Sequence, residues 1–145
     1  MTYPAHFSLE EFLHSDTGNS IGASNYPSWE VVDNLRRVAD IMENIRSGAG
    51  VPVIISSGYR SPPVNAAVGG AENSAHLYGL ACDFTIPDWG SPLDICLKLE
   101  PYVAYLGIDQ LINEVSWVHL GLAANGAIAR GECMTINENG TCYGF

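Results

Sequence analysis

The longest hydrophobic pattern in the chain lies between residues 29 and 48, where apolar residues recur at intervals of three and four. This spacing places them on one face of an α-helix, with charged residues on the opposite face. The apolar positions are Val31, Val32, Leu35, Val38, Ile41, Met42 and Ile45. Gly48 and Gly50 follow and predict the end of the helix. The pattern predicts an amphipathic helix of about four to five turns that begins near Pro27.

A second, shorter helix is predicted directly after Phe7. Ser8 and Glu11 have the spacing of a capping box, and Phe7 and Phe12 have the spacing of a hydrophobic staple. Residues 14–25 are rich in Ser, Gly and Asn, which predicts a loop between the two helices.

Short apolar and β-branched runs predict a set of strands in the rest of the chain. The predicted strands are residues 51–57, 80–86, 109–113 and 117–122, with a turn at 114–116 and a C-terminal hairpin within 126–143. Between them the pattern predicts a short helix or turn at 61–65, a glycine-containing loop at 66–74 and a helical segment at 93–105. This order predicts an α+β fold, with helices on one side of a small, mostly antiparallel sheet. No repeat or domain boundary is evident, so we expect residues 1–145 to form a single domain.

Composition and charge exclude several classes of partner. The chain carries 16 acidic and 6 basic residues, a net charge of -10. No basic stripe is present to bind the phosphates of nucleic acid or an anionic membrane surface. No apolar run is long enough to span a bilayer, and the first residues lack the features of a signal peptide. We therefore expect a protein made in the cytoplasm that does not insert into membranes, and we expect a monomer.

The four cysteines do not form a CxxC pair, which argues against a structural zinc knuckle. Cys82 and Cys96 lie in apolar surroundings, as buried thiols do. Cys133 and Cys142 flank the turn signal Asn139-Gly140, so a hairpin can bring them close enough for a disulfide or leave both free.

Three separated residues have side chains that bind zinc. His76 and Asp83 are seven positions apart, with Gly79 between them, and His119 follows in a predicted strand. A catalytic zinc site commonly uses three protein ligands and leaves a fourth position for water or substrate. His, Asp and His supply that number, so the sequence predicts one Zn²⁺ per chain if the three meet in space.

The residues around these positions resemble a known family of zinc peptidases. The resemblance rests on the motif 57–61 (SGYRS), the motif 74–83 (S-x-H-x-x-G-x-A-x-D) and the motif 117–119 (WVH). Together they resemble the zinc D-alanyl-D-alanine carboxypeptidases, a superfamily that includes vancomycin-resistance dipeptidases, phage endolysins and the hedgehog signalling domain. The resemblance is closest to the small phage and bacterial branch, and covers most of the chain from Phe7 to about Gly121.

The resemblance implies roles for individual residues. It assigns His76, Asp83 and His119 as zinc ligands, and Arg60 as the group that holds a carbonyl or carboxylate of the substrate. Some relatives have an acidic residue three places before the last His, where this chain has Ser116. We therefore predict that Glu114 is the general base, with Asp109 as the alternative base or as a residue that orients a ligand.

Further residues are predicted at the edge of this site. Ser74 matches a family position and can form a hydrogen bond near the zinc, while Tyr59 and Trp117 either contact substrate or pack around the site. We assign no role to His6 and His14, which lie outside the motifs.

The resemblance implies a zinc peptidase that acts on peptidoglycan stem peptides or cross-links. A single domain without a signal peptide suits a phage endolysin that reaches the cell wall after release, or a virion component. The alternatives are a D-Ala-D-Ala carboxypeptidase or dipeptidase and, from another class, a zinc-bound binding module without catalysis, which Ser116 favours.

Overall fold

The computed structural model describes residues 2–145, and a six-stranded sheet forms its centre. The strands lie in the order β1-β2-β4-β3-β5-β6. Their bounds are β1 Ile54–Ser57, β2 Ala81–Thr85, β3 Gln110–Asn113, β4 Val118–Gly121, β5 Glu132–Asn137 and β6 Gly140–Tyr143. Every neighbouring pair is antiparallel except β3 and β5, which are parallel. The predicted α+β class with a mostly antiparallel sheet is confirmed.

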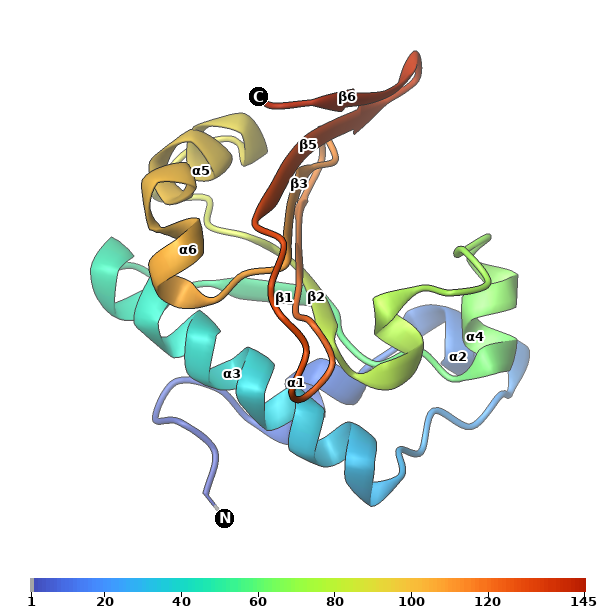
Figure 1. Cartoon of the computed structure of the whole chain (residues 1–145). Coiled ribbons are helices and arrows are strands. Elements are labelled where there is room, and N and C mark those ends of the chain that lie inside the picture. Colours follow the sequence, from blue (N-terminus) through green and yellow to red (C-terminus); the bar gives the residue numbers. More distant parts are fainter. Residues whose placement is uncertain (1) are drawn as a thin grey trace.

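Helices lie to either side of this sheet, rather than on the one side that was predicted (Figure 1). The α-helices are α1 Leu9–Leu13, α2 Asp16–Ile21, α3 Trp29–Ala49, α4 Pro62–Ala67, α5 Pro92–Leu99 and α6 Val103–Leu106, and the 3₁₀ turns are η1 Ala75–Tyr78 and η2 Glu100–Tyr102. The longer helices α3 and α5 lie with α6 on one side of the sheet, whereas the short α2, α4 and η1 gather on the other (Figure 1). None of the helices in residues 2–145 has the length and apolar character that a membrane span requires.

The alternation of side chains along the central strands separates a hydrophobic core from a polar face. Cys82 and Phe84 of β2 belong to the core together with Val118 and Leu120 of β4, and all four are fully buried. Successive residues of a strand point to opposite faces. Asp83, which lies between two core residues of β2, therefore points away from the core.

The loop predicted for residues 14–25 is wrong, because it contains the helix α2. The side chain of Ser15 accepts a hydrogen bond from the Gly18 amide at the start of this helix. Gly22 ends it in the left-handed conformation, with φ of 66°. The Ser and Gly residues that predicted a loop are the residues that cap a short helix.

The long helix α3 has 21 residues, or about six turns, and is longer than predicted. Gly50 ends it with φ of 69°, whereas Gly48 lies within the helix. The predicted capping box at the start of α1 is confirmed, since the Glu11 carboxylate accepts a hydrogen bond from the Ser8 amide at 2.9 Å. The rings of Phe7 and Phe12 lie with centroids 6.0 Å apart, as the hydrophobic staple predicts.

All four cysteines are free thiols. Cys82 and Cys96 are fully buried, as predicted. The predicted hairpin of β5 and β6 forms, and in its register Cys142 lies opposite Thr135 rather than Cys133. Cys133 and Cys142 are therefore diagonal neighbours, and diagonal Cα atoms of an antiparallel pair lie farther apart than a disulfide usually spans.

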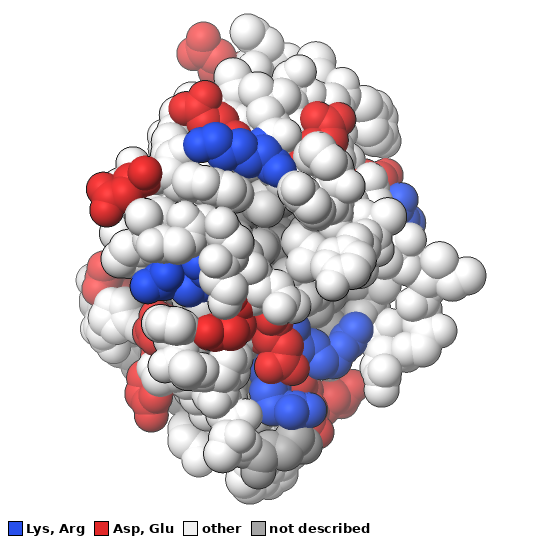
Figure 2. All heavy atoms as spheres, turned by 90° about the vertical axis from the view of Figure 1, so that its left-hand side faces the viewer, with Lys and Arg blue, Asp and Glu red and all other residues white. Residues whose placement is uncertain are grey.

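On the face that carries α3, α5 and α6, the residues from 2 to 145 form no continuous basic surface. Figure 2 shows this side of the molecule, where Lys and Arg side chains lie among Asp and Glu side chains. The basic residues here do not gather into a patch that could offset the net charge of -10.

We expect Gly58→Ala to destabilise the fold by about 1–3 kcal/mol, because the new methyl group has no space. A Cβ atom at Gly58 would lie 2.7 Å from the Phe12 Cα and even closer to the Phe12 carbonyl oxygen. That oxygen accepts a hydrogen bond from the Tyr59 amide. Urea unfolding monitored by circular dichroism measures the change.

Gly48→Ala is the matched control for this substitution. A Cβ atom there meets nothing within 4 Å, and the residue is helical. Alanine should therefore raise stability by up to about 1 kcal/mol. Equal effects of the two substitutions would show that the contact with Phe12 is unimportant.

Candidate metal centre

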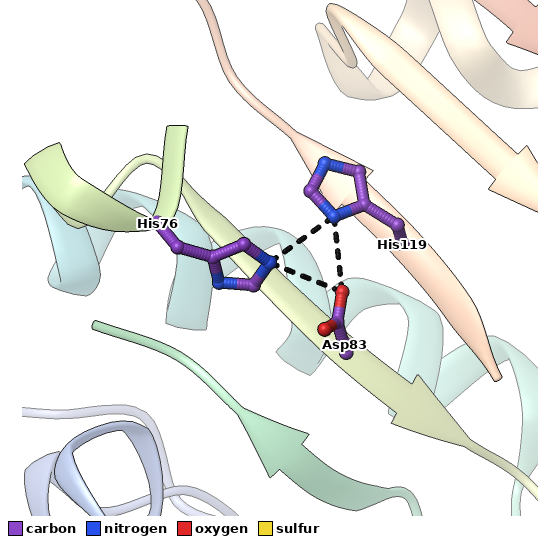
Figure 3. Close-up of side chains that lie close together, drawn as sticks. All are labelled: His76, Asp83 and His119. Carbon is purple, nitrogen blue, oxygen red and sulfur yellow. Dashed lines mark hydrogen bonds and ion pairs between the residues drawn. The ribbon is translucent and has the colours of Figure 1, made fainter. Parts of the chain in front are cut away.

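The side chains of His76, Asp83 and His119 meet on the polar face of the sheet (Figure 3). His76 Nε2 lies 3.2 Å from Asp83 Oδ1 and 3.2 Å from His119 Nδ1. His119 Nδ1 lies 2.9 Å from the same Asp83 oxygen. One atom from each residue therefore points to a common centre.

The backbone explains how residues so distant in sequence come together. Asp83 and His119 are directly paired in the β2–β4 register, which puts their side chains on the same face. His76 comes from η1, where the Ser74 side chain accepts a hydrogen bond from the His76 amide. Gly79 then ends η1 with φ of 68°, and a Cβ atom there would lie 2.7 Å from the Val31 carbonyl oxygen. This tight turn brings His76 back over β2.

A backbone contact fixes the orientation of the His76 ring. Its Nδ1 lies 2.6 Å from the Gly58 carbonyl oxygen, which can only accept a hydrogen bond. Nδ1 therefore carries the proton, and Nε2 presents a lone pair to the centre. Such a second partner is the usual way in which proteins orient a metal-binding histidine.

Burial and hydrogen bonding set the charges of the cluster. Burial lowers the pKa of His76, which favours the neutral imidazole that binds metal. Burial acts to raise the pKa of Asp83, but hydrogen bonds with His119 and His76 outweigh it and hold that pKa well below its usual value. Neutral imidazole and ionised carboxylate are the protonation states of metal ligands.

The three residues fit a zinc ion. A tetrahedral ion with ligand distances of about 2.0–2.2 Å separates its ligand atoms by about 3.3–3.6 Å. The two observed separations of 3.2 Å are close to this range, and the separation of 2.9 Å between His119 and Asp83 requires a small outward shift of their side chains. The three residues are also almost fully buried, with exposed fractions of 1% for His76 and 9% each for Asp83 and His119. Three N and O ligands with room beside them suit a site that keeps an open position.

A cavity of about 600 Å³ opens beside the cluster. Four other residues predicted from the sequence line it, namely Arg60, Ser74, Glu114 and Trp117. Segments from α2 and α4 form another part of its wall. A substrate of several residues could therefore reach the candidate metal centre.

Arg60 lies at the wall of this cavity, half-buried beside the cluster. Its amide donates a hydrogen bond to the His76 carbonyl oxygen at 3.0 Å, which ties its backbone to the metal-binding turn. Its buried Nε atom has no hydrogen-bond partner among residues 2–145. Burial lowers the pKa of the guanidinium, and the charges of Asp83 and Glu114 act in the opposite direction. A carboxylate or polarised carbonyl of a ligand would satisfy this donor.

Glu114 lies at the end of β3, half-buried on the wall of the same cavity. Burial raises the pKa of its carboxyl group, and the negative charge of Asp83 raises it further. A carboxylate with a raised pKa is a better proton acceptor near neutral pH. The next residue, Val115, has φ of 67°, an uncommon conformation for a β-branched side chain.

Three residues from the sequence prediction lie elsewhere. Tyr59 is buried in the hydrophobic core and does not line the cavity. Asp109 also lies outside it, in an ion pair with Arg130. Ser116 is exposed on the turn between β3 and β4 and is not among the residues of the cavity wall.

One residue that the sequence reasoning set aside lies at the cavity. His14 lines it together with Asp16, and His14 Nε2 lies 2.8 Å from the Asp16 carboxylate. The start of α2 places His14 and Asp16 beside the cavity. The prediction of a loop at residues 14–25 gave no reason to expect His14 there. His6 instead contacts Glu43 at the protein surface.

We expect Asp109→Asn to lower the free energy of unfolding by about 1 kcal/mol without changing metal affinity. The Asp109 carboxylate accepts hydrogen bonds from the Arg130 side chain and from the Arg130 amide. The hydrogen bond from the Arg130 side chain lowers the pKa of Asp109. Its stabilising effect is therefore present above the unfolded pKa of about 3.9 and is lost as the pH falls through the folded value.

Urea unfolding at neutral and acidic pH tests this expectation, with zinc titration as the second measurement. A loss of metal affinity in the variant would instead connect Asp109 with the metal centre.

Comparison with known proteins identifies one family. The family model for Peptidase M15 matches residues 5–120, which is most of the chain and includes every candidate ligand together with Arg60 and Glu114. No match was found among curated proteins. The matched region ends at Leu120, so β5 and β6 lie outside it.

Proposed function

The chain belongs to the peptidase M15 family, and from this premise we propose that it is a zinc-dependent peptidase that cleaves peptidoglycan stem peptides or cross-links. The observation that carries the proposal is the convergence of His76, Asp83 and His119 in a cavity that also holds Arg60 and Glu114. Metal ligands, a cation and a carboxylate are the groups that peptide hydrolysis at a metal site requires.

The three ligands would hold one Zn²⁺ ion through His76 Nε2, Asp83 Oδ1 and His119 Nδ1. When bound, zinc supplies a Lewis acid that polarises the scissile carbonyl and lowers the pKa of water to about 7. The hydrogen bond from His76 Nδ1 to the Gly58 carbonyl keeps the ring oriented while the site is loaded and emptied.

Glu114 and Arg60 supply the remaining functions. The Glu114 carboxylate accepts a proton from the attacking water and then donates it to the leaving amine. The Arg60 guanidinium holds the carboxylate or the carbonyl oxygen of the substrate and stabilises the negative charge that develops there. Both residues line the cavity from which substrate approaches the ligands.

The arginine and the open form of the cavity suit a peptide substrate from the cell wall. Such peptides have free carboxylates that the half-buried Arg60 can bind, and they present long chains that need an open site. We propose that the protein acts as an endolysin-like enzyme in a phage-infected host or as part of a virion. Cleavage of D-Ala-D-Ala ends is the alternative reaction at the same site.

One observation favours a function without catalysis. Ser116 occupies the position where some relatives have an acidic residue, and it lies exposed on a turn rather than in the cavity. A protein that binds zinc but lacks a working base would be a binding module. Glu114 in the cavity wall is the reason to prefer the enzyme.

The test is the digestion of purified peptidoglycan by the zinc-loaded protein, with and without a chelator, followed by mass spectrometry of the released fragments. Release that the chelator abolishes supports the peptidase, and the fragment masses identify the bond. A protein that retains one zinc per chain but releases nothing would be a binding module instead.

A further inference from the structure

The sheet face that carries the candidate metal ligands continues beyond them onto the C-terminal hairpin. His119 pairs with Ile112 of β3, Ile112 pairs with Met134 of β5, and Met134 pairs with Tyr143 of β6. Directly paired residues point to the same face of a sheet. The face that carries His119 therefore extends across three further strands, two of which lie outside the region matched by the family model.

A second groove lies on this extension, next to the first cavity. Its volume is about 560 Å³, and Glu114 and Trp117 line both spaces. The groove is also lined by Val115 of the turn between β3 and β4, and by Ile136 and Glu138 of the hairpin. Trp117, with an exposed fraction of 37%, therefore lies at the boundary between two adjacent parts of the cleft.

The two parts of the cleft differ in whether a basic residue lines them. The cavity at the metal centre contains Arg60 together with the carboxylates of Asp16, Asp83 and Glu114, and the guanidinium suits a carboxylate of the substrate. The hairpin groove is lined by the carboxylates of Glu114 and Glu138, by the amides of Asn137 and Asn139, and by no Lys or Arg among the described residues. Its apolar wall is formed by Ile136, Val115 and the Trp117 ring. A segment with an aliphatic stem and an amino group matches this lining, whereas a carboxylate does not.

We propose that the hairpin groove is the subsite for the amino-terminal side of the peptide substrate, and that it favours a residue with a side-chain amine. This inference rests on the proposed function. With the carboxyl-terminal side held near Arg60, the peptide crosses the metal centre and passes Trp117 into the hairpin groove. Glu138 at the end of the hairpin contacts the amine, and Ile136 contacts its aliphatic stem.

Two synthetic peptides test the subsite. They share the scissile bond and the carboxyl-terminal side, and they differ in one residue on the amino-terminal side, which bears either a free side-chain amine or its acetylated form. The wild-type protein should show a KM about fivefold lower for the amine, with similar kcat. Glu138→Lys should remove or reverse this preference, and Ile136→Ala should raise the KM of both peptides.

Glu10→Lys is the matched control, because Glu10 is exposed on α1 and lines neither part of the cleft. Glu10→Lys changes the net charge by the same amount as Glu138→Lys and should keep the preference for the peptide with the free amine. A preference that persists in Glu138→Lys, or that is lost equally in Glu10→Lys, overturns the proposal.

A second measurement separates failure of this subsite from failure of the proposed peptidase function. If no variant cleaves either peptide, calorimetric binding of the two peptides to the zinc-loaded wild-type protein decides the question. Tighter binding of the amine form, lost in Glu138→Lys, supports the subsite even without catalysis. Equal binding of both forms, or no binding of either, overturns it.

Discussion

We expect His119→Ala to remove bound zinc and peptidase activity together. The substitution leaves His76 and Asp83 as the only ligands of the cluster, and a site with two protein ligands holds zinc weakly. Loss of a residue that only orients a ligand already costs about 10- to 100-fold in metal affinity, so loss of a ligand should cost more than about 100-fold. Metal analysis after dialysis against a zinc buffer measures the loss, and turnover of peptidoglycan should fall with it.

His14→Ala is the control for this experiment. His14 lines the same cavity, but its ring contacts Asp16 and does not belong to the metal cluster. The control should bind one zinc per chain with the affinity of the wild type. Retention of stoichiometric zinc by His119→Ala would contradict the assignment of the three ligands.

We expect Glu114→Gln to bind zinc normally and to lose turnover by about 10²- to 10⁴-fold, the usual contribution of a general base. Glutamine has the size of glutamate but cannot accept the proton from water. Because Glu114 lies on the cavity wall and is not part of the metal cluster, affinity for zinc should change little. Zinc titration and steady-state kinetics on the same preparation separate the two effects.

The pH profile provides the second part of this test. Burial raises the pKa of Glu114, and the base works only when ionised. In the wild type, kcat/KM should therefore fall as the pH decreases through this raised pKa, and the residual activity of Glu114→Gln should lack that decrease. Asp109 pairs with Arg130 outside the cavity, so Asp109→Asn should keep the turnover of the wild type. If Glu114→Gln kept nearly full activity, Glu114 could not be the general base.

The sequence predicted the candidate ligands but not the arrangement that joins them. His76, Asp83 and His119 could be named because their residue types and motifs point to zinc chemistry. The pairing of Asp83 with His119 depends on β4 lying between β2 and β3, a contact between strands far apart in the chain. Local patterns do not encode such a register, because every strand of similar length has several possible partners.

Adjacent residues of one motif also have side chains in different parts of the structure. Tyr59 and Arg60 are adjacent, yet Tyr59 lies in the core and Arg60 lines the cavity. A motif identifies both residues equally, whereas the direction of each side chain depends on the backbone around Gly58. The helix α2 was missed for a related reason, since its Ser and Gly caps have the composition of a loop.

The strand order has a consequence for how the protein folds. β3 and β4 adjoin in sequence and can pair early, but β2 reaches β4 only after the chain through α5 and α6 has closed. The complete metal centre therefore cannot exist until this late, long-range pairing has formed. We expect saturating zinc to slow unfolding while leaving the refolding rate unchanged, which stopped-flow kinetics in urea can measure. Bound zinc would then prolong the lifetime of the folded chain without helping it to fold.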